Sequence, residues 1–217
     1  MAIQNFRAQK LDTAQLAEIV GKSTFASTIA LDVTESPIGD GGLSALAASP
    51  HTLKLKALWV DKTGVTDKGA QALASAQAPL EELYIGYNKV GVVGLKALLG
   101  MSAARFQVLR LSFDPIGDPG AALLATAPLG VLERLDLVST GLTDAGGRAV
   151  LGSTTLAKLD TLDLSHNALS AQVLEPLLDP AHLPALKTLY LGGSTLDADL
   201  RRRVLAVRPN LVINTDG

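Results

Sequence analysis

The sequence contains no cysteine among its 217 residues. This absence excludes disulfide bonds, thiolate metal sites and cysteine nucleophiles. Aromatic residues make up only 4% of the chain against 47% hydrophobic residues, so a core of leucine, alanine, valine and isoleucine is expected. The formal net charge of −2 gives no general electrostatic reason to bind nucleic acid or an anionic membrane.

Long apolar runs are also missing. No stretch approaches the roughly 18 apolar residues that a membrane-spanning helix needs. The first residues, MAIQNFRAQKLD, lack the apolar segment of a secretory signal. We therefore expect no membrane association and a cytoplasmic location.

What the chain does contain is a repeat. An L-x-L core recurs seven times at intervals of 25 to 27 residues. The first leucine of each core is Leu31, Leu58, Leu83, Leu109, Leu135, Leu162 and Leu189. Five positions further on, each row has a short polar residue, namely Ser36, Thr63, Asn88, Asp114, Thr140, Asn167 and Ser194. Aliphatic residues fill the columns at positions seven and fifteen, so each row is one structural unit.

These rows resemble the leucine-rich repeat, L-x-x-L-x-L-x-x-N/T-x-L, and row six reads LDTLDLSHNAL. The period and the repeated turn with Asp and Gly are most similar to the ribonuclease-inhibitor-like class, in a bacterial style. The resemblance covers about residues 28–214. It implies an α/β fold: a right-handed horseshoe of about seven repeats plus caps, with parallel strands on the concave face and helices on the convex face. Extracellular members often have cysteine-rich caps, so the lack of cysteine favours the cytoplasm.

The expected organisation is an N-terminal helical cap at 1–27, continuous with a single repeat domain at 28–214. Within the cap, Leu11 to Gly21 is predicted to be a helix, with Asp12 as N-cap and Gln15 completing a capping box. At the other end, Pro176 predicts a short or irregular sixth helix. A final helix and an eighth strand, Leu211 to Ile213, should close the array.

Each row should consist of a short strand, a polar turn and a helix. The Asn or Thr that ends the strand is expected to bond to the turn backbone and tie adjacent rows together. An aspartate is then predicted to cap the helix of its own row, in the column Asp40, Asp67, Asp118 and Asp144. A glycine two residues later leaves room for the neighbouring helix.

Residues between the core leucines should point away from the core. This places the only tryptophan and all three tyrosines on the concave face, where structure alone does not require them. Aromatic residues and arginine are enriched at binding hot spots. The predicted protein-binding face consists of Trp59, Tyr84, Tyr87, Arg110, Phe113, Asp136, Asp163 and Tyr190. The first five should form one patch across rows two to four, although Phe113 could instead turn inward. The alternative is that the rings stack only to stabilise the sheet.

Asp136 and Asp163 are neighbours in one column. Paired carboxylates can form an acid–base pair or half of a metal site. The preferred interpretation is exposed charges balanced by Arg134 and Arg110, because no nucleophile or oxyanion donor accompanies the pair. No metal, cofactor or catalytic residue is predicted.

We therefore expect a non-enzymatic module or scaffold, monomeric, that binds another protein through its concave face. Two alternatives stay open. One is a regulator of a small GTPase, for which Arg110 or Asn88 would be the candidate residue. The other is a bacterial effector or immunity-type protein, excluding an effector ligase that needs a cysteine nucleophile.

Overall fold

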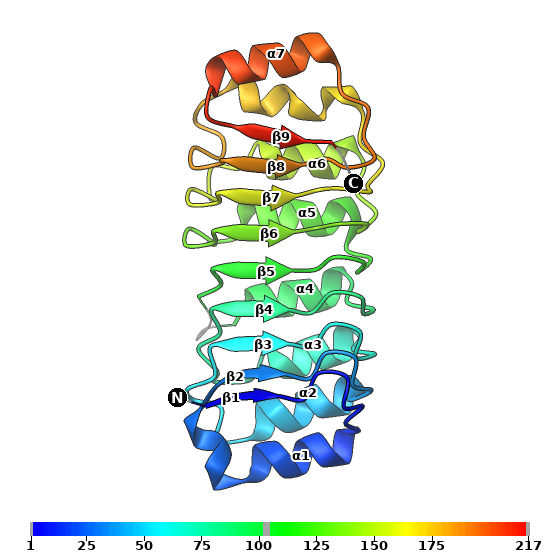
Figure 1. Ribbon diagram of the computed structural model, residues 1–217, viewed down its shortest axis with the longest axis vertical. Coiled ribbons are helices and arrows are strands. Elements are labelled where there is room, and N and C mark those ends of the chain that lie inside the picture. The colour runs from blue at the N-terminus through cyan, green and yellow to red at the C-terminus, as the bar shows by residue number, and fades with distance from the viewer. Residues whose placement is uncertain (1, 102–104, 216–217) are drawn as a thin grey trace. The chain divides into compact units, whose positions relative to one another are not determined.

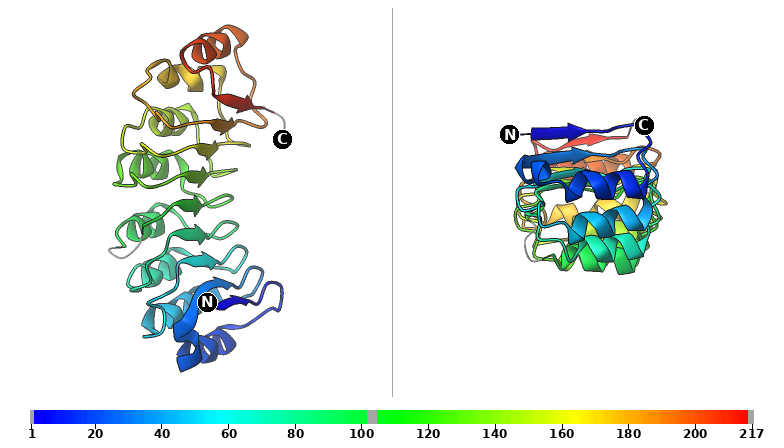
Figure 2. Two further views of the ribbon diagram at one scale, coloured as in Figure 1. Left: turned by 60° about the vertical axis from the view of Figure 1, so that its left-hand side comes forward. Right: turned by 90° about the horizontal axis from the view of Figure 1, so that it is seen from below.

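A computed structural model describes residues 2–101 and 105–215, and it divides into two compact units, Met1–Arg110 and Leu111–Gly217 (Figure 1). Each unit is a parallel sheet in which strands adjacent in sequence are adjacent in space. In each unit the helices lie on one side of the strands (Figure 2). We call the opposite side the strand face. The predicted α/β solenoid of strand–turn–helix rows is thereby confirmed.

Unit 1 contains five strands and four α-helices within its described residues, together with one 3₁₀ helix. In chain order they are β1 Ala2–Asn5, α1 Thr13–Gly21, η1 Ser23–Ser27, β2 Thr28–Asp32, α2 Gly39–Ala48, β3 Ala57–Trp59, α3 Asp67–Leu73, β4 Glu82–Tyr84, α4 Val92–Leu99 and β5 Val108–Arg110.

Unit 2 follows the same plan in the part of it that the structure describes. Its elements are α5 Gly117–Thr126, β6 Arg134–Asp136, α6 Asp144–Leu151, β7 Thr161–Asp163, η2 Ala171–Leu178, β8 Thr188–Tyr190, α7 Ala198–Val207 and β9 Val212–Asn214. Pro176 lies inside η2, a 3₁₀ helix, which confirms the irregular sixth helix. The final helix and the eighth predicted strand are present as α7 and β9. No helix in the described parts of either unit is long and apolar enough to cross a membrane.

The core lies between strands and helices. The strands of rows one to seven direct their central leucines into it, and these leucines are fully buried. The parallel register aligns these leucines directly, as in the pairs Leu31 with Leu58 and Leu162 with Leu189. Burying an aliphatic side chain contributes about 1.5–3 kcal/mol, so a repeated leucine column stabilises every row in turn.

Asparagines tie neighbouring rows together, as predicted, whereas the prediction is wrong for threonine, because the Thr63 and Thr140 hydroxyls donate to carbonyls of their own rows. The Asn88 Oδ1 accepts hydrogen bonds from the backbone N–H groups of Thr63 (3.0 Å) and Val65 (3.1 Å) in the preceding row. Its Nδ2 donates to the carbonyls of Val60 (2.8 Å) and Ile85 (2.6 Å). Asn167 repeats this arrangement in unit 2. One amide thus satisfies turn groups of two rows that water does not reach.

The predicted role of the turn aspartates is wrong in one respect. They lie within the first turn of their own helix but bond to the next row. Asp118 Oδ1 accepts from the backbone N–H of Thr143 (2.8 Å) and of Gly146 (3.0 Å), and Asp118 Oδ2 accepts from the Thr143 hydroxyl (2.6 Å). Thr143 is the N-cap residue of α6, so one row's carboxylate completes the cap of the next.

The glycine in this motif is needed because the carboxylate lies against it. A Cβ atom at Gly146 would stand 2.4 Å from Asp118 Oδ1, and one at Gly69 would stand 2.5 Å from Asp40 Oδ1. The expectation that the glycine leaves room for the neighbouring helix is confirmed. The group that a side chain at this position would meet is the aspartate that joins the rows.

The first residues contribute more than the predicted helix. Helix α1 has the expected capping box between Asp12 and Gln15, and Leu16 and Val20 are buried. In addition, β1 pairs in parallel with β2, which adds a strand that the repeat did not reveal. Gln4 stands opposite Leu31 in this register, so the leucine that marks every other row is absent here.

Candidate functional site

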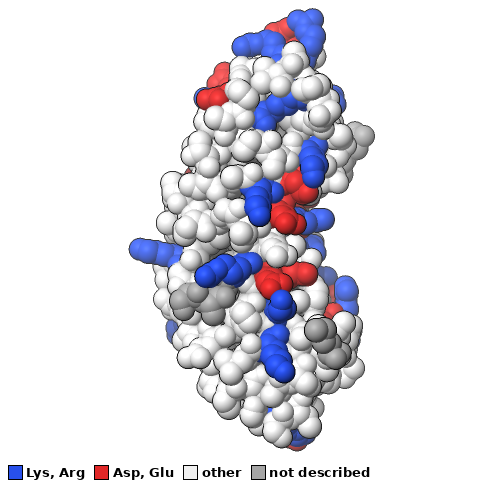
Figure 3. Space-filling view, turned by 90° about the vertical axis from the view of Figure 1, so that its left-hand side faces the viewer, with Lys and Arg blue, Asp and Glu red and all other residues white. Residues whose placement is uncertain are grey.

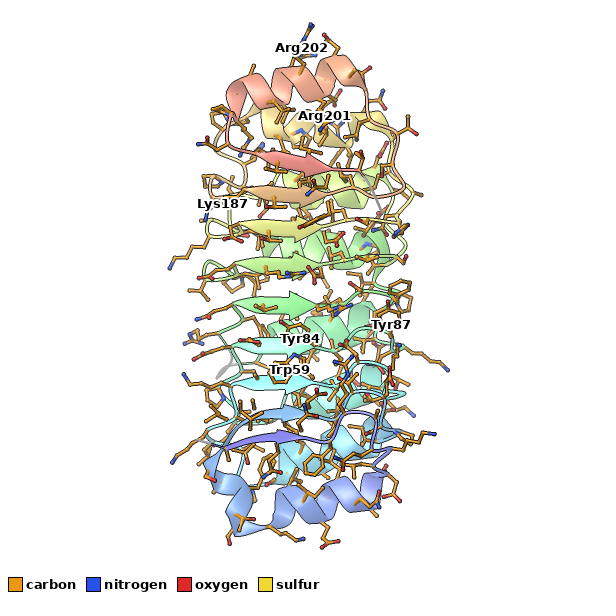
Figure 4. The ribbon with its side chains drawn as sticks, in the orientation of Figure 1. Trp59, Tyr84, Tyr87, Lys187, Arg201 and Arg202 are labelled. Carbon is orange, nitrogen blue, oxygen red and sulfur yellow. The ribbon has the colours of Figure 1, made fainter. Side chains whose placement is uncertain are left out.

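A pair of stacked rings occupies the strand face of unit 1. Trp59 ends β3 and Tyr84 ends β4, and the two residues are paired in register. Their ring centroids are 5.5 Å apart at an interplanar angle of 30°. Both side chains are half-buried and lie over the strands, as Figure 4 shows. The predicted orientation toward the strand face is therefore observed for both.

The same column continues on either side of the rings. Asp32 is paired with Trp59, and Tyr84 with Arg110. Arg110 is half-buried, and its Nε is buried with no hydrogen-bond acceptor in the described chain. Four neighbouring strands thus present an acid, two rings and a guanidinium in one line. Three of the predicted binding residues are brought together here.

Tyr87 lies beyond the strand ends, beside this column (Figure 4). It is 39% exposed, and its backbone adopts a left-handed conformation with φ of +56°. Lys62 places its ammonium group 5.2 Å from the ring centroid and also pairs with Glu35 at 3.3 Å. The equivalent residues of the other rows, Lys62 and Phe113 among them, also have positive φ, so this conformation belongs to the repeat turn.

Asp61 is a residue of this face that the sequence analysis did not select. It follows β3, two residues after Trp59, and only 8% of its surface is exposed. No described residue donates a hydrogen bond to its Oδ1. Burial raises the pKa of the Asp61 carboxyl above its usual value, although the charge of Arg110 opposes this effect. The repeat places Asp61 three positions after Leu58, in a different column from the turn aspartates, but the sequence does not reveal its burial.

The remaining predicted residues belong to unit 2. Phe113 is 41% exposed, so the alternative that it turns inward is wrong. Its backbone φ of +63° is similar to that of Tyr87, which occupies the equivalent position in the preceding row. Tyr190 ends β8, is half-buried, and is paired with Asp163 on one side and Asn214 on the other.

The two carboxylates of unit 2 have separate roles. Asp136 is buried, at 5% exposure, and the Arg134 guanidinium donates to both of its oxygens at 3.1–3.2 Å. Asp163 Oδ1 accepts a hydrogen bond from the Ser165 backbone N–H at 2.9 Å. The expectation that both charges are exposed is thus wrong for Asp136, and its balance by Arg134 is confirmed. Among the described residues, no group of three His, Cys, Asp or Glu could hold a metal ion.

Asn88, a candidate in the GTPase alternative, does not face a partner. It is 9% exposed, and both atoms of its amide bond to backbone groups. These backbone hydrogen bonds explain why an asparagine occupies this position. This leaves Arg110 as the residue of that alternative, and it lies on the strand face.

Charged side chains on the edge where the strands begin lie beside partners of opposite sign (Figure 3). In unit 1 the Lys56 Nζ lies 2.7 Å from Glu81 Oε1, and in unit 2 the Lys187 Nζ lies 3.4 Å from Asp160 Oδ2. Exposed pairs of this kind contribute about 0–1 kcal/mol each. They leave the strand face as the more distinctive surface of unit 1.

A cavity of about 480 Å³ lies beside α7 in unit 2, lined in part by Leu196, Arg201 and Arg202. Arg201 donates to the Ile213 carbonyl at 3.1 Å, and Arg202 pairs with Asp199. Arg201, Arg202 and Arg203 are exposed, as predicted for a solvated end. None of the predicted binding residues lines this cavity.

Comparisons with known proteins agree with this architecture. The family model for the leucine-rich repeat matches residues 29–47, 77–99 and 131–151. Each match spans a strand, its turn and a helix region. No curated protein has a matching sequence. Together with the row structure, these matches identify leucine-rich repeats in the chain.

Among solved structures, an internalin (inlF) from Listeria monocytogenes is similar, with a TM-score of 0.61 and 19% sequence identity. The similarity covers 94% of this chain and 54% of the internalin chain, so this protein spans about half the length of that relative. At this level of identity the likeness establishes the fold alone.

Proposed function

We propose that this protein is a non-enzymatic interaction module that binds a protein partner through the strand face of unit 1. The observation that carries the proposal is the stacked Trp59–Tyr84 pair on an open sheet surface. Arg110 extends the column and Tyr87 adds an exposed ring beside it. Repeat solenoids present preformed surfaces of this kind, which lowers the ordering cost of association.

The competing explanation is that the rings only stabilise the sheet. A stacked aromatic pair contributes about 0.5–1.5 kcal/mol beyond its buried area. That contribution does not require the exposed ring of Tyr87 beside the pair or an arginine in the same column. Aromatic residues and arginine are enriched at binding hot spots, so their grouping here favours a partner.

The test compares the wild type with Trp59→Ala/Tyr84→Ala in affinity capture followed by binding measurements with the purified partner. The proposal predicts a loss of hot-spot size, at least about 2 kcal/mol, or roughly thirtyfold in Kd. Val93→Ala is the matched control, because Val93 is an exposed apolar residue of the same unit on helix α4. Equal binding by the double variant, or equal loss in the control, would rule out this face as the binding surface.

A further inference from the structure

Asp61 has a buried acceptor atom that the chain does not use. In the described residues, its Oδ1 has no hydrogen-bond donor. Leaving a buried polar group without a partner costs about 1–3 kcal/mol, and more for a charged group. The native protein therefore retains a locally unfavourable carboxylate. Asp61 keeps 8% of its surface exposed, and a donor that a second molecule brings to this part of the carboxylate would offset that cost.

The charged groups around Asp61 do not supply this donor. Burial is the largest influence and raises the pKa of its carboxyl; Arg110, the Gly86 backbone and Arg7 act in the opposite direction, while Asp32 adds to the rise. The two arginines act at a distance, without forming an ion pair with Asp61. Two arginine charges thus act on Asp61, yet its Oδ1 lacks a hydrogen-bond donor.

The rings and the carboxylate lie on the same side of the sheet. Bonding to the next row continues past β3, from the Val60 N–H to the Tyr84 carbonyl (2.8 Å) and from the Lys62 N–H to the Gly86 carbonyl (3.1 Å). Alternation is therefore maintained, and Asp61 follows Trp59 by one full strand period, about 7 Å. A planar cation on a side chain that spans this distance would contact the rings and the carboxylate together.

We propose that the partner inserts an arginine here, with its guanidinium stacked against the Trp59–Tyr84 pair and donating hydrogen bonds to Asp61. This inference rests on the proposed function and specifies the chemistry of the partner. Arginine fits better than lysine because its guanidinium is planar, stacks on aromatic faces and donates through a fixed fork.

The experiment begins with a library of displayed random peptides selected on the purified full-length protein. Selected peptides are then synthesised in two forms, with arginine or with its uncharged isostere citrulline at the enriched position. Binding is followed by the fluorescence anisotropy of a dye attached to the peptide, which reports equally on variants that lack Trp59, the only tryptophan in the chain. The arginine peptide should bind at least about tenfold more tightly than the citrulline peptide, the effect of one close charge pair.

The variant Asp61→Asn provides the double-mutant cycle. In Asp61→Asn the arginine and citrulline forms should bind equally, because the group that distinguishes them is gone. Its unfolding midpoint should equal or exceed that of the wild type, since an uncompensated buried charge has been removed. A lower midpoint would mean that Asp61 serves the fold, and would overturn the inference.

The remaining outcomes separate the inference from the proposed function. Peptides that require Trp59 and Tyr84, yet lack arginine or bind Asp61→Asn equally, would refute the arginine site and leave the binding face intact. Peptides that bind Trp59→Ala/Tyr84→Ala as well as the wild type would refute both. Selection that yields no binder would count against both as well.

Discussion

Replacing Asn88 with alanine should destabilise unit 1 by an amount that can be worked out from its contacts. The substitution removes the oxygen that accepts from two buried backbone donors, the N–H groups of Thr63 and Val65. The Val60 carbonyl keeps its bond from the Thr63 hydroxyl at 2.7 Å, and the Gly86 carbonyl keeps its bond from the Lys62 N–H. The Ile85 carbonyl loses its bond from Asn88 Nδ2, but a carbonyl without a partner is tolerated more often than an N–H group, so the cost arises mainly from the two donors.

An orphaned buried donor costs about 1–3 kcal/mol, so Asn88→Ala should lose about 2–6 kcal/mol of unfolding free energy. Asn88→Thr is the matched variant, because threonine occupies this column at Thr63 and Thr140. The threonine hydroxyl would bond to a carbonyl of its own row, as Thr140 Oγ1 does to Leu137 (2.9 Å), but would not reach the preceding row. An intermediate loss is expected.

Urea unfolding of the three proteins measures these differences, with unchanged m-values showing that the folded state is otherwise preserved. Hydrogen exchange at the amides of Thr63 and Val65 reports the same bonds locally and should accelerate in Asn88→Ala. A loss below about 1 kcal/mol, with exchange at both amides unaltered, would refute the reasoning that Asn88 carries the contact between rows.

Four further changes test other parts of the structure. Gly146→Ala should cost about 1–3 kcal/mol in urea unfolding, because its Cβ would meet the Asp118 carboxylate at 2.4 Å, whereas Gly130→Ala, with no atom nearer than 3.9 Å, should be neutral. A hydrogen bond from the next row's cap threonine lowers the pKa of Asp118, so the stability advantage of wild type over Asp118→Asn should be complete above about pH 4 and shrink as pH falls through the lowered pKa. Tyr87→Gly should keep or raise the unfolding midpoint, because glycine accepts a φ of +56° without strain, while it weakens partner binding. Binding of an arginine peptide should be strongest above the raised pKa of Asp61 and weaken as pH falls through it, whereas Asp61→Asn should bind independently of pH in that range.

The repeat made the fold predictable, because one residue type recurs in each column for one physical reason. Leucine columns marked the strands, and the row-ending asparagines marked the bonds between rows. The strand β1 was not predicted, since Gln4 occupies the leucine position and the strand is held by pairing rather than by core burial. Single-row patterns also misassigned Asp118, because its acceptor role depends on the next row's backbone.

The candidate site was predictable only in part. Alternation along the strand correctly placed Trp59 and Tyr84 on one face, because a side-chain direction follows from strand geometry. Burial of Asp61 and Asp136 was not predictable, since it depends on what neighbouring rows place around each carboxylate. The same residue type is paired with arginine at Asp136 and has an unpartnered oxygen at Asp61.

Collisional quenching of the single tryptophan tests the central claim most directly. In the free protein, acrylamide should reach Trp59, and in a complex with a selected peptide the quenching constant should fall because the partner covers the ring. Val93→Ala should show the same protection. Quenching that is unchanged on binding, with affinity retained in Trp59→Ala/Tyr84→Ala, would contradict the assignment of this face.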